Sequence, residues 1–166
     1  MGERIDPDHA LWGALREHLA RVEMEPWVID KDGRPMPGVY YLGVVDNECV
    51  VGHISIKLQD IIIPATEWSG GMETLMTKDG VRLTETFVQT FAVDEAYRRR
   101  GYGQALQLAA LDLTREIGAY QMRSWSSLDK PANYMLKLRL GFAAHPAIFE
   151  TPTGLKVSGV YFAKTV

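Results

Sequence analysis

The chain has a single cysteine among its 166 residues, Cys49, so it cannot form a disulfide with itself. Sequences without paired cysteines are typical of proteins that fold in a reducing compartment, and we expect a cytoplasmic location. No apolar run approaches the roughly 20 residues that cross a bilayer. The first residues, Met1–Pro7, have neither the basic start nor the apolar stretch of a signal peptide. We therefore expect neither export nor a membrane partner.

An excess of positive charge and a cluster of metal ligands are also missing. The net charge is −3, which disfavours binding to nucleic acid, because phosphate contacts need many lysine and arginine side chains on one surface. The histidines show no spacing to cysteine, aspartate or glutamate that would hold zinc or iron; they are His9, His18, His53 and His145. The expected partners are therefore neither nucleic acid nor a metal ion.

What the sequence does contain is an ordinary globular composition with alternating helix and strand patterns. Hydrophobic residues make up 46% and charged residues 23%, and a chain of this length forms one domain, residues 1–166. The patterns predict a helix from Pro7 that is capped by Asp6 and ends before Pro26, strands near 39–46, 49–58 and 87–93, a helix from about Gly101 to Ile117, a strand near 120–126, a helix at 131–140 and a strand near 155–164. This order predicts a mixed α/β layer fold.

The segment AYRRRGYGQAL, residues 96–106, joins the third of these strands to the second helix. Gly101 and Gly103 expose the main chain where the first N–H groups of a helix lack partners and the helix dipole adds roughly half a positive charge. Such a helix start binds phosphate, and the arginines would add charge-assisted contacts. The alternative is a tight turn beside a solvated arginine cluster. The segment has neither the spacing of a P-loop nor the third glycine of a dinucleotide fingerprint.

FAVDEAYRRRGYGQAL resembles the acyl-CoA-binding motif of the GNAT superfamily of N-acetyltransferases, which reads [RQ]-x-x-G-x-[GA] after a strand that ends in an apolar residue. Arg98, Gly101 and Gly103 match the motif, and Val93 stands at the expected distance before it. Further along, Leu140-Gly141-Phe142 resembles the L-G-F that closes the next helix of the superfamily. Two motifs at the right separation make the resemblance specific.

The resemblance covers roughly residues 38–166 and implies a mixed, mostly antiparallel central sheet flanked by helices. Two strands, 87–93 and 120–126, would be splayed apart to form an acyl-CoA cleft, with acetyl-CoA as the acyl donor. The pyrophosphate would rest on main-chain N–H groups, the pantetheine arm would pair with a strand, and the thioester carbonyl would accept a hydrogen bond near Ala92. The implied binding residues are Phe91, Ala92, Val93, Arg98, Arg99, Arg100, Gly101, Tyr102, Gly103, Gln104 and Asn133.

The residues that would move protons depart from the family pattern. Many members carry a tyrosine four residues before the glycine of L-G-F, where its hydroxyl protonates the departing thiolate; Lys137 stands there in this chain. Lys137 is either that acid or a solvated helix residue. Tyr134, one turn earlier, is either a substitute acid or a packing residue. Asn133 either contacts the CoA arm or binds the local loop.

The general base is equally open. Some members place a glutamate on the strand before the motif, at the position of Phe87 here. Glu85 is two residues earlier and on the same face of the strand, so it would take the amine proton through water, or it is an exposed charge near a strand start. The stretch 59–80 has no clear pattern. Three of its side chains suit an acceptor pocket, internal packing or a homodimer contact: Trp68, Met72 and Met76. The pattern does not place its two carboxylates, Glu67 and Glu73.

The function implied by the resemblance is transfer of an acetyl group from acetyl-CoA to a primary amine on a small molecule or a peptide. The alternative, raised by the lysine at the tyrosine position, is a module that binds or senses acyl-CoA without turnover.

Overall fold

The computed structural model describes residues 2–64, 71–150 and 153–166. The helices are α1 (Trp12–Arg21), α2 (Tyr102–Glu116) and α3 (Pro131–Arg139), with short 3-10 turns at Glu25–Trp27 and Glu95–Tyr97. The strands are β1 (Glu3–Arg4), β2 (Val39–Asp46), β3 (Cys49–Asp60), β4 (Ile62–Pro64), β5 (Met72–Thr74), β6 (Thr84–Val93), β7 (Gln121–Ser127), β8 (Ala143–Glu150) and β9 (Lys156–Thr165). None of the described helices is long and apolar enough to cross a membrane.

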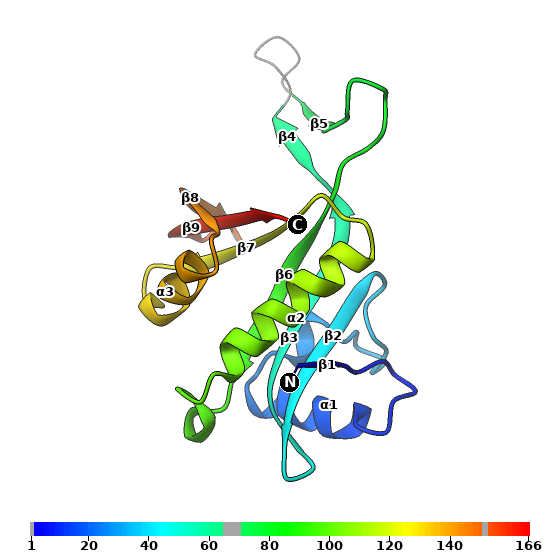
Figure 1. Cartoon of the computed structure of the whole chain (residues 1–166), viewed down its shortest axis with the longest axis vertical. Coiled ribbons are helices and arrows are strands. Elements are labelled where there is room, and N and C mark those ends of the chain that lie inside the picture. Colours follow the sequence, from blue (N-terminus) through cyan, green and yellow to red (C-terminus); the bar gives the residue numbers. More distant parts are fainter. Residues whose placement is uncertain (1, 65–70, 151–152) are drawn as a thin grey trace.

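Seven strands form one sheet in the order β1-β2-β3-β6-β7-β9-β8, and β4 and β5 form a separate hairpin that projects from it (Figure 1). Strands β6 and β7 run parallel, while the other neighbours that the structure describes in this sheet run antiparallel. The two parallel strands pair only over Glu85–Phe87 and Gln121–Arg123. Beyond these rungs β6 stays paired with β3 and β7 stays paired with β9, so β6 and β7 separate. The prediction of a mostly antiparallel sheet with one splayed strand pair is confirmed.

A β-bulge in β6 lies where the strands separate. Ser55 of β3 faces Thr90 and Ile56 faces Val88, so Gln89 is an extra residue on β6. A bulge bends its strand and changes which side chains share a face. The bend therefore falls just beyond the last rung that joins β6 to β7.

The helices cover the two faces of the sheet. Helices α2 and α3 lie on one face, where Leu106, Ala110 and Leu113 of α2 pack against the sheet together with Tyr134 of α3. Helix α1 covers the other face over β2 and β3, with a second cluster that includes Leu15 and Leu19. Helices α1 and α2 each bury a mainly apolar stripe, as the periodicity of their sequences predicts, whereas the fully buried residue of α3 is Lys137.

Several predicted elements differ from the structure. The first helix begins at Trp12, not Pro7, and its N-cap is Leu11, while the Asp6 carboxylate binds Arg4. Strand β8 was not predicted because its sequence, AAHPAIFE, contains Pro146; the strand lies at the edge of the sheet, where proline is tolerated.

The stretch 59–80 continues β3 to Asp60 and then forms the β4–β5 hairpin. Met72 and Met76 lie on this hairpin and its return, where both side chains are exposed. They are therefore not packed inside the protein. Glu73 is also exposed, whereas Glu67 and Trp68 lie outside the described residues.

Candidate active site

The loop before α2 presents a row of free main-chain donors. Arg99 and Gly101 have φ angles of 62° and 85°, in the left-handed region, and no side chain caps the helix. The main-chain N–H groups of residues 99 to 104 donate to no acceptor among the described residues. Successive free N–H groups at a helix start form a site for an anion, which the helix dipole strengthens.

Two of the three arginines beside this loop bind protein groups. The Nε atom of Arg98 donates to the carbonyl of Val93 at 3.1 Å. The guanidinium of Arg100 lies over the ring of Tyr97 and 3.9 Å from a carboxylate oxygen of Asp46. Arg99 makes no such contact within the described residues. The main chain and Arg99 are thus the groups left to hold an anion.

Gly103 lies in the first turn of α2 and faces β6 and α3. A Cβ atom at this position would lie 3.4 Å from the ring of Phe91 and 3.6 Å from a methyl group of Leu136. These are ordinary contacts, so an alanine fits the fold, but it would occupy the space beside the free N–H groups. The glycine therefore leaves the space beside Phe91 and Leu136 free of a side chain.

The main chain of β6 from Phe91 to Val93 lies beside this gap. Its partner on one side is β3, and β7 does not pair with it there. An extended ligand arm can complete such a strand by main-chain hydrogen bonds. Ala92 lies in the middle of this stretch, opposite His53 of β3, and on the next residue the Val93 carbonyl accepts the hydrogen bond from Arg98.

Two buried amide groups beside α3 have unused hydrogen-bonding atoms. Asn133 donates from Nδ2 to the hydroxyl of Ser126 on β7, but its Oδ1 has no partner among the described residues. Gln107, one turn beyond Gly103 on α2, likewise has an unpartnered Nε2. One free acceptor and one free donor fit a ligand arm that carries amide groups, as pantetheine does. Asn133 thus binds β7, not the local loop. Gln107 was not predicted, because its burial follows from packing against α3.

Lys137 is fully buried between α2 and α3, with 0% of its surface exposed. Its Nζ donates to Oε1 of Gln107 at 2.9 Å and lies 4.7 Å from the ring centre of Phe142. Burial lowers the pKa of Lys137 to about 7. The interpretation of Lys137 as a solvated helix residue is therefore wrong.

Tyr134 lies on the same helix and points toward β7. Its hydroxyl donates to the main-chain carbonyl of Ser126 at 3.1 Å, and its ring packs 5.3 Å from that of Phe162. Loss of hydration, and to a smaller extent the charge of Asp129, raise the pKa of Tyr134. The tyrosine is therefore both a packing residue and a potential proton donor at the edge of the gap.

Glu85 is fully buried, and its carboxylate already has several donors. Arg123 binds both oxygens through Nε and Nη2 at 2.5 to 3.0 Å. The side-chain amides of Gln59 and Gln121 add one hydrogen bond each. The expectation of an exposed charge is wrong, and the predicted role of Glu85 as a general base has no geometric support in this arrangement.

A chain of buried polar side chains reaches the bulge of β6 from the α1 side, and it was not predicted. His18 and His53 lie 2.9 Å apart between Nε2 and Nδ1, and Nε2 of His53 lies 2.9 Å from the hydroxyl of Thr90. Asp94 lies 3.2 Å from His18 at the outer end. The two histidines are 35 residues apart in sequence, so no local pattern joins them.

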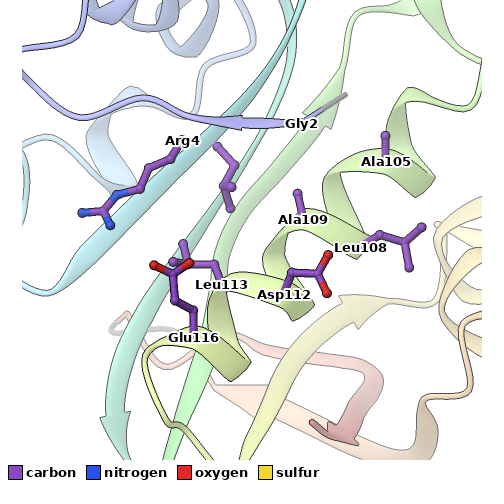
Figure 2. Close-up of a pocket in the computed structure, with 9 residues that line it drawn as sticks. Gly2, Arg4, Ala105, Leu108, Ala109, Asp112, Leu113 and Glu116 are labelled. Carbon is purple, nitrogen blue, oxygen red and sulfur yellow. The ribbon is translucent and has the colours of Figure 1, made fainter.

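A cavity of about 460 Å³ lies between β1 and the outer side of α2. Figure 2 shows that Arg4, Asp112 and Glu116 surround it, with Gly2 and Ala109 close to one another. It does not include Gly103, Gln107 or any residue of β6 or β7. We therefore place the candidate site at the separated strands and not in this cavity.

Comparison with known proteins gives one family and many similar structures. The family model described as Acetyltransferase (GNAT) family matches residues 6–142. No curated protein matches the sequence. The structure of Arabidopsis thaliana NAA60 in complex with acetyl-CoA is 15% identical, with a TM-score of 0.69 over 100% of this chain and 98% of that one.

Two further structures share the architecture. Aminoglycoside 6'-acetyltransferase type Ii is 16% identical, with a TM-score of 0.62 over 99% of this chain and 96% of that one. The ribosomal-protein-S18-alanine N-acetyltransferase from Escherichia coli is 15% identical, with a TM-score of 0.60 over 100% of this chain and 94% of that one. At these identities the similarity shows the fold.

Proposed function

The chain belongs to the acetyltransferase (GNAT) family, and on that premise we propose that it transfers an acetyl group from acetyl-CoA to a primary amine of a small molecule or peptide. The observation that carries the proposal is the row of free N–H groups from Arg99 to Gln104, which leads past Gly103 into the gap between β6 and β7. An anion site that continues into an open strand edge matches a ligand with a pyrophosphate and an extended amide arm. One similar structure contains acetyl-CoA.

In this proposal the protein holds acetyl-CoA mainly through its main chain. The pyrophosphate binds the N–H groups at the start of α2, and Arg99 adds charge. The pantetheine arm pairs with Phe91 and Val93 as an additional strand. Its amides use the free Nε2 of Gln107 and the free Oδ1 of Asn133. The thioester carbonyl accepts a hydrogen bond near Ala92, which strengthens as negative charge develops on the oxygen.

The reaction forms a C–N bond and breaks the C–S bond of the thioester. The amine must be neutral when it attacks, and the nitrogen loses a further proton as the amide forms, while the thiolate gains one. Lys137 is the acid that we assign to the thiolate, because its pKa of about 7 lets it donate near neutral pH. Tyr134 is the second candidate. Positioning of the amine beside the thioester supplies much of the rate.

Thiol release from acetyl-CoA over a panel of amines tests this function, together with calorimetric titration of the protein with CoA. We expect CoA to bind and at least one class of primary amine to release thiol. Binding without thiol release from any amine would instead support a module that senses acyl-CoA.

We further propose a cytoplasmic location, because the one cysteine, Cys49, is exposed and free. A homodimer through the stretch 59–80, which contains β4 and β5, stays a prediction. A measurement of molecular mass in solution would test it.

A further inference from the structure

The face of the sheet opposite α2 and α3 carries a fixed arginine at the last rung before the strands separate. Phe87 of β6 and Arg123 of β7 form this rung. Thr86 beside it contacts Thr114 of α2, so Phe87, its neighbour in the strand, points the other way. Tyr161 of β9 also points away from the helices, since the next residue, Phe162, packs against Tyr134 of α3.

This arginine is held rigidly on three sides. Its guanidinium carbon lies 5.1 Å from the ring centre of Phe87 and 5.1 Å from that of Tyr161. The buried carboxylate of Glu85 binds the edge formed by Nε and Nη2. An arginine has five N–H donors, and this contact uses only that edge. The Nη1 group has no partner among the described residues, and 28% of the Arg123 side chain is exposed. A donor edge that can bind a second carboxylate is therefore free and oriented in advance.

The charge on this face favours an anion. Glu85 and Arg123 cancel one another. Lys57 of β3 lies opposite Phe87 in register, on the same face, and its side chain is exposed. The sum of these three charges is one positive charge beside the start of the gap. A polycationic amine would be repelled here, whereas a carboxylate would be attracted.

On the proposed function, the acceptor approaches from this face. In the proposed function CoA occupies the side of the gap that α2 and α3 cover, so the thioester is open to attack from the opposite side. We infer that Phe87, Tyr161 and Arg123 form the acceptor site, and that Arg123 binds a carboxylate of the acceptor. The preferred acceptors are then amines that carry a carboxylate on the same molecule, as amino acids do. This inference rests on the acetyl transfer proposed above.

Matched acceptors test the inference directly. Alanine, methionine and phenylalanine are each compared with their amides and with the amines that lack the carboxyl group, with acetyl-CoA as donor. A charge-assisted hydrogen bond contributes about 1.5–3 kcal/mol, so the acid of each set is expected to exceed its amide in kcat/KM by about tenfold or more, mainly through KM. Equal kcat/KM values within every set would overturn the inference and leave the acetyl transfer intact.

Paired variants assign the preference to Arg123. Arg123→Gln alone would leave Glu85 buried without its partner, so Glu85→Gln and Arg123→Gln are combined, which removes both charges together. We expect this double variant to accept acid and amide within about twofold, with unchanged affinity for acetyl-CoA. Arg82→Gln is the matched control, because Arg82 is an exposed arginine that pairs with Asp60, and it should keep the preference. A folded double variant that keeps the preference would overturn the assignment.

A binding measurement separates this inference from the proposed function. If no amine releases thiol, the proposed function fails, and the site is tested by calorimetry of the CoA-loaded protein with N-acetylphenylalanine and with its amide. Tighter binding of the acid, lost in the double variant, supports a carboxylate site. Equal binding of the two compounds overturns it.

Discussion

His18 and His53 form a buried pair, with 2.9 Å between Nε2 of the first ring and Nδ1 of the second. Neither side chain is exposed by more than 1%. Removal from water, and to a smaller extent the neighbouring histidine, lower the pKa of His53 to about 3. Loss of hydration also lowers the pKa of His18, with Asp94 opposing this shift and Arg21 adding to it. Both rings are therefore neutral at neutral pH, and the pair joins α1 to the bulge of β6.

The first prediction concerns stability at acid pH. The folded pKa of His53 is below the unfolded value of about 6.5, so between pH 6.5 and 3 the unfolded chain binds more protons than the folded one. The stabilisation is present above pH 6.5 and is lost as the pH falls toward 3. Between pH 7 and 5 we expect His53 to account for a loss of about 2 kcal/mol in the free energy of unfolding.

Chemical denaturation at pH 7 and pH 5 measures this loss. His53→Asn should show a smaller difference between the two pH values than the unaltered protein, although it is less stable at pH 7. The exposed His145 supplies the control His145→Asn, which should keep the full difference. An unchanged pH difference in His53→Asn would show that the pair is not the source.

The second prediction separates CoA binding from folding at Gly103. Alanine makes only ordinary contacts there and is favoured over glycine inside a helix by roughly 1 kcal/mol, so Gly103→Ala should unfold at the same or a higher temperature. Its methyl group would lie beside Phe91 and Leu136, close to the free N–H groups, and we expect the affinity for CoA to fall by about tenfold or more. Calorimetry with CoA and a thermal melt measure the two effects. Unchanged affinity would place the pyrophosphate elsewhere.

The third prediction compares the arginines. Because Arg98 binds the carbonyl of Val93 and Arg100 lies near Asp46, Arg99→Ala should weaken CoA binding more than Arg100→Ala does. One charge-assisted contact corresponds to about tenfold in the dissociation constant. The three single alanine variants are titrated with CoA at low and at physiological salt. A larger effect of Arg100 would mean that its side chain leaves Asp46 when CoA binds.

The fourth prediction concerns the acid for the thiolate. If Lys137 donates the proton, Lys137→Met should lower kcat by about 100-fold, the lower end for general acids, because a thiolate is a fair leaving group. With a pKa of about 7, Lys137 loses its proton as the pH rises, so kcat should carry a falling limb near pH 7 that the variant lacks. Tyr134→Phe is the matched comparison. A large loss in Tyr134→Phe, with the limb kept in Lys137→Met, would assign the proton to the tyrosine.

The local motif was the part of the site that could be predicted. Gly101 needs a left-handed conformation and Gly103 needs an absent side chain, and both demands act within a few residues, so the sequence displays them. Glu85 and Lys137 were interpreted less well. Lys137 stands at a motif position and Glu85 two residues before one, but the partners that determine their state, Gln107 and Arg123, come from distant segments.

The sequence by itself determined the order of the main helices and strands, the glycine-rich start of α2 and the family. Periodicity, turn residues and short motifs are local properties, so a short window of the sequence is enough to recognise them. Only the tertiary structure decided which side chains are buried and paired. It places Glu85 against Arg123 on one face of the sheet, and Lys137 against Gln107 on the other. Burial and ion pairing arise when segments far apart in the chain meet, and those contacts decide which groups can move a proton and which can bind an acceptor.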